Sequence, residues 1–185
     1  MSSLSKLALQ NNKEEIVLLL QQGADVNEQD ANGFTALYFA CHLNYTKLAE
    51  FLLQNKKINV NLQNKDGWSP FSSSACLNDR CAIIHFLLQD ARVDTNLANY
   101  CGCSPLMQAC YYGRTKTIQL LLSYGRNIDV HKKSTKDNGD IISGSTALDI
   151  AKRRNITYIV QLLQQYINNT KETQKTLRNQ LLKNT

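Results

Sequence analysis

The stretch Gly33-Phe34-Thr35-Ala36-Leu37 opens a pattern that recurs along the chain and decides the fold. Each copy begins with a glycine, and the copies lie at Gly33, Gly67, Gly102 and Gly144, which are 34, 35 and 42 residues apart. Two residues after each glycine stands a hydroxyl side chain, at Thr35, Ser69, Ser104 and Thr146. A period of about 20–50 residues is typical of stacked repeats, so we expect one repeated structural unit along most of the chain.

Each copy carries the signals of a helix start and a helix stop. A Ser or Thr side chain can accept a hydrogen bond from the free backbone N–H groups of a first helical turn, and Pro or Ala suits the first helical position. Those first positions are Ala36, Pro70, Pro105 and Ala147. Residues that tolerate a left-handed backbone follow at Asn44, Asn78, Gly113 and Asn155, and they predict where these helices stop.

A second apolar stretch follows each predicted stop. Leucine and isoleucine recur in it at intervals of three and four residues, as in Leu48-x-x-Phe51-Leu52-Leu53 and Ile118-x-Leu120-Leu121-Leu122. This spacing is typical of a helix that buries one broad face. An earlier copy at residues 16–20 brings the number of expected helix pairs to five. Because neither helix of a pair can bury its apolar face alone, we expect the pairs to stack in a row.

These residues resemble the ankyrin-repeat family, with further matches in Gly23-Ala24-Asp25-Val26-Asn27 and Ser104-Pro105-Leu106-Met107-Gln108-Ala109. The resemblance covers residues 4–166 and implies an all-α repeat solenoid, in which β-hairpin-like loops join stacked helix-turn-helix repeats. We expect a repeat domain at 1–166, with units at 1–31, 32–65, 66–100, 101–142 and 143–166, the first and last acting as caps. The C-terminal tail, 167–185, has leucines at helical spacing that predict a short helix.

The resemblance also implies that the hairpins and the first helices form a concave protein-binding surface. Positions after the turn glycine, positions in the first helix and flanking hairpin residues supply the candidate partner-binding residues: Phe34, Tyr38, His42, Lys65, Asp66, Trp68, Leu77, Tyr100, Cys103, Tyr111, Tyr112, Arg153 and Arg154. Aromatic and arginine side chains carry most of the energy of protein interfaces, so we expect a non-enzymatic module that binds another protein through this face. The alternative for Phe34 and Trp68 is that they fold over their own repeats and seal the hairpins.

The fourth unit is longer than its neighbours by seven or eight residues, and the excess falls in the polar stretch at 130–140. An extended hairpin could reach a partner, whereas surface loops also tolerate insertions at little cost. An alternative function is therefore a structural or inhibitory module that occludes a partner through its edge or through the inserted loop at 130–143.

Composition argues against several other classes of protein. The chain has 185 residues, 43% of them apolar and 19% charged, which is typical of a soluble globular protein. The apolar run at 16–20 is far too short to span a membrane, and the N-terminus lacks the features of a secretory signal. We expect a cytoplasmic or nuclear monomer without membrane insertion, and delivery as an effector is left open.

The six cysteines and three histidines form no recognised metal or catalytic signature. Cys101-Gly102-Cys103 with Cys110 lacks the paired spacing of zinc sites, and the glycines occur singly rather than in a phosphate-binding loop. The sequence therefore predicts no metal, no cofactor and no enzymatic activity. Residues 126–185 hold eleven Lys and Arg against five Asp and Glu, but no basic stripe interleaved with aromatics predicts nucleic-acid binding.

Asn27 resembles the asparagines that are hydroxylated in ankyrin repeats. The same residue also suits a structural role in its turn, so the sequence alone leaves both interpretations of Asn27 open.

Overall fold

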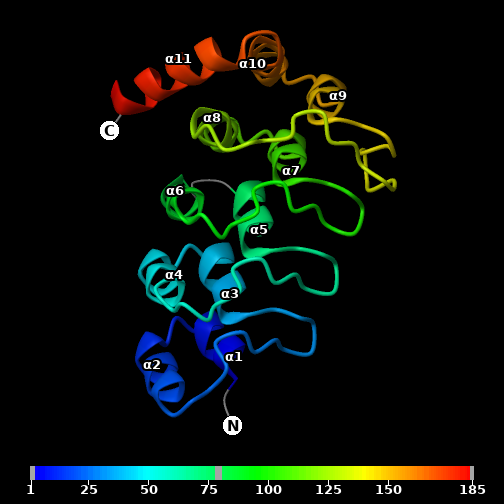
Figure 1. Ribbon diagram of the computed structural model, residues 1–185. Coiled ribbons are helices and arrows are strands. Elements are labelled where there is room, and N and C mark those ends of the chain that lie inside the picture. Colours follow the sequence, from blue (N-terminus) through cyan, green and yellow to red (C-terminus); the bar gives the residue numbers. More distant parts are fainter. Residues whose placement is uncertain (1–2, 78–80, 184–185) are drawn as a thin grey trace.

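The structure is a computed structural model that describes residues 3–77 and 81–183 as helices joined by turns and loops (Figure 1). The five helix pairs are α1 (Leu4–Leu9) and α2 (Lys13–Gln21), α3 (Ala36–His42) and α4 (Thr46–Leu53), α5 (Pro70–Cys76) and α6 (Cys81–Gln89), α7 (Pro105–Tyr111) and α8 (Thr115–Ser123), and α9 (Ala147–Arg153) and α10 (Thr157–Asn168). A further helix, α11 (Thr170–Lys183), ends the described chain. Among the described residues, no helix combines the length and the apolar composition needed to cross a membrane.

The first helix of each later pair begins where the hydroxyl residues predict. The side chains of Thr35, Ser69, Ser104 and Thr146 each accept a hydrogen bond from the backbone N–H three residues further on. Asn44, Gly113 and Asn155 have positive φ values of 63°, 67° and 56° just after these helices, as the predicted stops require. Asn78, the remaining predicted stop, lies outside the described residues. The caps therefore confirm the helix starts, and they confirm the stops wherever the chain is described.

The helix pairs stack in a row, as the repeat pattern predicts. In Figure 1, α1, α3, α5 and α7 form one column, α2, α4, α6 and α8 form a second column, and the hairpin-like loops project from the first column. Consecutive first helices pack on each other from α1 through to α9. Large apolar side chains such as Leu37, Phe71 and Leu106 are buried between them. Within the described residues this gives an all-helical repeat solenoid whose core runs along the stack.

Asparagine side chains tie consecutive units together on the loop side. The Asn27 carboxamide donates to the Lys57 carbonyl at 2.9 Å and accepts from the Asn59 backbone N–H at 2.7 Å. Asn61 and Asn96 make the same pair of bonds to the next unit along the chain. These bonds give Asn27 a structural role, and its hydroxylation stays a prediction.

The hairpins share one pattern of closing bonds, which the inserted loop keeps. In the hairpin that precedes α3, the Asp30 backbone N–H donates to the Phe34 carbonyl, and the Gly33 N–H donates to the Asp30 carbonyl. In the long hairpin, Ser134 pairs in the same way with Ser145 and Gly144. Asp30 and Gly33 are three residues apart, whereas Ser134 and Gly144 are ten apart. The insertion therefore lies inside the hairpin tip and leaves the register of the repeat unchanged.

The C-terminal helix α11 covers the end of the second column of helices. It packs on both α8 and α10, and Figure 1 shows it running back across the top of α8. Leu177 is only 2% exposed, and the Arg178 Nε donates to the Ser123 carbonyl, in the last residue of α8, at 2.6 Å. α11 thus shields apolar surface of α8 that the stack would otherwise leave open.

Most of the cysteines belong to the core. Cys41, Cys76, Cys103 and Cys110 are buried, whereas Cys81 and Cys101 are partly exposed. The expectation that Cys103 contacts a partner is corrected, because its side chain is fully buried beneath its hairpin. Burial raises the pKa of the Cys41 and Cys76 thiols to about 12 and that of Cys103 to about 11, and it also raises the pKa of Cys110.

Leu177→Ala is expected to lower the free energy of unfolding by about 2–5 kcal/mol, because Leu177 is buried and its truncation leaves a cavity where α11 packs on the rest of the stack. Leu182→Ala is the matched control on the same helix, since Leu182 is 75% exposed, and its effect should stay within about 0.5 kcal/mol. Urea unfolding followed by circular dichroism measures both variants. Equal stability of the two variants would contradict a structural role for α11.

Alkylation is expected to separate the two classes of thiol. At pH 8 a thiol with a pKa of about 12 is ionised in only about one molecule in ten thousand, and the thiolate is the form that reacts. Iodoacetamide should therefore modify Cys81 and Cys101 in the folded protein, and Cys41, Cys76, Cys103 and Cys110 only after unfolding in urea. Peptide mass spectrometry gives the sites, and rapid modification of Cys41 in the folded protein would refute the assignment.

Candidate partner-binding groove

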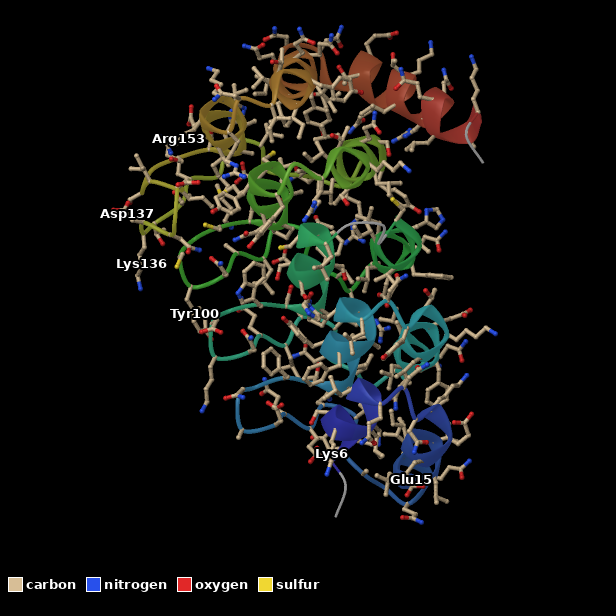
Figure 2. The ribbon with its side chains drawn as sticks, turned by 180° about the vertical axis from the view of Figure 1, so that it is seen from behind. Lys6, Glu15, Tyr100, Lys136, Asp137 and Arg153 are labelled. Carbon is tan, nitrogen blue, oxygen red and sulfur yellow. The ribbon has the colours of Figure 1, made fainter. Side chains whose placement is uncertain are left out.

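A pocket opens on the side of the molecule from which the hairpins project. In Figure 2, Tyr100, Lys136 and Asp137 lie on this side, whereas Glu15 lies on the opposite side with the second helices. The pocket has a volume of about 470 Å³ and is lined by Lys65, Asp66, Trp68, Asn99, Tyr100, Cys101, Gln108, Tyr111, Tyr112, Lys136, Asn138 and Ile141. We call this pocket and its rim the groove. It joins two hairpins, the helix α7 and the inserted loop.

Hydrogen bonds to the backbone fix the hairpin walls of the groove. The Asn64 Oδ1 accepts from the backbone N–H groups of Asp66 at 3.0 Å and Trp68 at 2.8 Å. Asn99 plays the same part in the next hairpin, where it accepts from Cys101 and Cys103. Because neighbouring hairpins also bond to each other through their backbones, the side chains that they present are held at fixed spacings.

Two tyrosines at the end of α7 form the aromatic wall. The rings of Tyr111 and Tyr112 meet edge to face with centroids 5.0 Å apart. The guanidinium of Arg154 lies 4.9 Å from the centroid of Tyr111, and that of Arg114 lies 5.5 Å from the centroid of Tyr112. Burial raises the pKa of Tyr112, so its hydroxyl stays neutral at physiological pH and can both donate and accept hydrogen bonds.

The inserted loop folds back and forms a further wall instead of projecting freely. The Asp140 carboxylate pairs with the Arg154 guanidinium at 3.0 Å, and the Asp140 carbonyl accepts from Arg153 at 3.0 Å. A Cβ atom at Gly139 would lie only 3.1 Å from the Tyr111 hydroxyl, so the loop backbone passes close to that ring. Arg153 and Arg154 therefore hold the loop against the groove.

A second aromatic cluster lies outside the groove on α3 and the hairpin before it. The Phe34 ring lies 4.6 Å from Tyr38 and 5.2 Å from Phe39, and the Tyr38 ring stacks on His42 at 5.7 Å between centroids. The His42 Nδ1 and Ser73 Oγ are 2.8 Å apart. Burial raises the pKa of Tyr38. These contacts fit the alternative in which Phe34 packs on its own repeat.

The structure thus brings together six of the predicted partner-binding residues around the groove: Lys65, Asp66, Trp68, Tyr100, Tyr111 and Tyr112. Arg153 and Arg154 do not line the groove but bond to Asp140 of the inserted loop. The half-buried Leu77 follows the end of α5 and also lies outside the groove lining. Asn99, Cys101 and Gln108 also line the groove and were not predicted from the sequence, whereas Lys136, Asn138 and Ile141 belong to the inserted loop at 130–143, which the sequence indicated only as a whole segment. Gln108 had one signal, since it is a long polar residue between Met107 and Ala109 in a helix that otherwise buries its side chains.

No group of three or more His, Cys, Asp or Glu side chains that could hold a metal ion occurs within residues 3–77 and 81–183. The chemistry available in the groove is instead that of neutral amides, aromatic rings, lysine ammonium groups and one carboxylate. These are groups suited to recognising another molecule by shape, hydrogen bonds and stacking.

Comparison with known families gives the same picture as the stacked helix pairs. The family model described as ankyrin repeats, in three copies, matches residues 5–99 and 74–175. Together the two matches extend from the first helix pair into α11. The chain therefore belongs to the ankyrin-repeat family.

Proposed function

We propose that this protein is a non-enzymatic interaction module that binds a partner protein in the groove. Ankyrin repeats generally mediate protein–protein interaction. The observation that carries the proposal is the pocket itself, in which aromatic side chains from two repeats converge. Large aromatic side chains in pockets are the residues that dominate the energy of protein interfaces.

Exposure and rigidity of the aromatic residues support this proposal. Tyr100 is 57% exposed and Tyr112 is 44% exposed, so a partner can reach both rings. The Tyr100 backbone N–H donates to the Asp66 carbonyl in the neighbouring hairpin, and the Tyr112 N–H donates to the Gln108 carbonyl at the end of α7. Binding to a surface that is already ordered loses little conformational entropy, which favours affinity.

The alternative proposal is occlusion of a partner through the edge or the inserted loop at 130–143. The loop exposes Ile142, which is 53% exposed on its outer side. Its inner side, however, lines the groove through Lys136, Asn138 and Ile141. Deleting the loop would therefore damage the groove as well, so point substitutions are needed to separate the two proposals.

Trp68→Ala combined with Tyr112→Ala is expected to weaken partner binding by at least about tenfold, because both substitutions remove aromatic area from the groove. The matched control combines Leu18→Ala with Leu182→Ala, which removes exposed apolar side chains from α2 and α11. A partner obtained by affinity purification with the wild-type chain would be titrated against each variant by calorimetry.

A third variant, Ile142→Ala, distinguishes binding in the groove from occlusion through the inserted loop. Unchanged affinity of the groove variant would refute the proposal, and a loss confined to Ile142→Ala would favour occlusion through the loop. Circular dichroism of each variant confirms that the repeats remain folded.

A further inference from the structure

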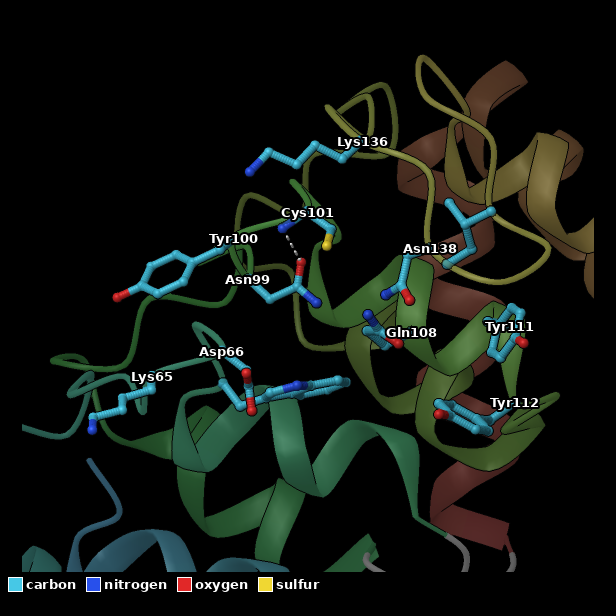
Figure 3. A pocket seen from close by; sticks show the side chains of 12 residues that line it. Lys65, Asp66, Asn99, Tyr100, Cys101, Gln108, Tyr111, Tyr112, Lys136 and Asn138 are labelled. Atoms are coloured by element: carbon cyan, nitrogen blue, oxygen red, sulfur yellow. Dashed lines mark hydrogen bonds between the residues drawn. The ribbon is translucent and has the colours of Figure 1, made fainter. Parts of the chain in front are cut away.

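Gln108 is a buried polar side chain that the fold leaves without a hydrogen-bond partner. It is 2% exposed, lines the groove, and its Nε2 has no partner among the described residues. Figure 3 shows Gln108 and Asn138 facing the same space, with Asn99 on one side and the two tyrosines on the other. Buried polar groups in proteins are almost always hydrogen-bonded, so an exception at the floor of a pocket needs an explanation.

The described part of the chain has one other buried side-chain atom of this kind, and that one has a structural explanation. The Asn44 Oδ1 also lacks a partner, but Asn44 has a φ of 63° and ends α3. Asparagine is favoured at such a position because it tolerates a left-handed backbone. Gln108 lies within α7, where an apolar residue of the same length would serve the helix equally well.

The chain itself shows what a carboxamide can bind in such a setting. Asn27 donates to the carbonyl of Lys57 and accepts from the N–H of Asn59, so it grips the main chain on either side of Ile58. The gripped residue directs an apolar side chain inward, since Ile58 is buried. We call this arrangement the carboxamide clamp.

The clamp recurs in two further turns with the same geometry. Asn61 and Asn96 grip the main chain around Val93 and Ile128, and both gripped residues are buried. In all three cases the main chain that is gripped is non-helical. A helix could not take its place, because its N–H and C=O groups already bond to each other.

We infer that Gln108 forms a fourth clamp, whose main chain belongs to the partner: an extended segment that presents one apolar residue to the groove. This inference rests on the proposed function. The Gln108 Nε2 donates to a carbonyl of the segment, and its Oε1 accepts from an N–H on the other side of the gripped residue. Because the nitrogen itself is buried, the carboxamide turns toward the segment as the bonds form.

The surroundings of Gln108 define the residue that is gripped. The side chain of the gripped partner residue would lie against the rings of Trp68, Tyr111 and Tyr112, which line the same pocket as Gln108. A pocket of about 470 Å³ has room for a large apolar or aromatic side chain. The partner class is therefore a non-helical peptide segment with a bulky apolar residue, read through its main chain and one side chain.

The test uses twelve-residue peptides displayed on phage and selected against the full-length chain. The tightest peptide would be synthesised and titrated against the wild type, Gln108→Met and Trp68→Ala. Methionine keeps the length of the side chain but removes its amide. We expect Gln108→Met to weaken peptide binding about tenfold while its melting temperature stays equal to or above that of the wild type.

Ester substitution of single peptide bonds then identifies the main-chain contact. Replacing the gripped N–H by an ester oxygen should weaken binding to the wild type about tenfold and leave binding to Gln108→Met unchanged, because that bond is already absent. A merely structural role for Gln108 would not produce this dependence on one peptide bond.

The possible outcomes separate the clamp from the proposed function. Loss of binding in Trp68→Ala with full binding in Gln108→Met would overturn the clamp and leave the groove as the binding site. Equal binding by all three proteins would overturn both. A selection that yields no peptide specific for the wild type would overturn the inference that the partner segment is extended.

Discussion

Stacking between neighbouring repeats is the interaction on which this structure depends. Nine of the ten helices in the five pairs, α1 to α9, have six to nine residues, which is shorter than a helix that is stable alone in water. Each gains its stability by burying one apolar face against the next pair. The same requirement explains α11: the last pair would leave part of α8 uncovered, and α11 supplies the missing neighbour.

A second constraint acts on the loops, where there is little apolar surface to bury. Hydrogen bonds made by side-chain amides and carboxylates stabilise the loops instead. Asn27, Asn61 and Asn96 bond one turn to the next. Asp30, Asn64 and Asn99 accept bonds from the backbone within their own hairpins. Each of these bonds is worth only about 1 kcal/mol. Repeated along the stack, however, they hold the hairpins at the spacing that creates the groove.

Much of the fold could be predicted from the sequence because its signals are local and recur. Thr35, Ser69, Ser104 and Thr146 mark helix starts by a bond that spans three residues, and Asn44 marks a stop by its own backbone conformation. The groove was predicted less completely. Cys103 follows the turn glycine Gly102, as the other candidate hairpin positions follow theirs, but its side chain is buried, and the direction of a side chain in a hairpin depends on the neighbouring repeat.

The inserted loop shows the same limit more clearly. Its length can be read from the glycine spacing, but its path is set by contacts with residues far along the chain, such as Asp140 with Arg154 and Gly139 with Tyr111. No local pattern encodes these contacts. Gln108 is a different case, because its sequence signal was present but could be read as one more helix-forming residue. Only the surrounding structure shows that its amide nitrogen has no bond. Local rules are expected to fail mainly where function takes precedence over stability, and an unbonded amide at the floor of an otherwise well-bonded groove is such a place.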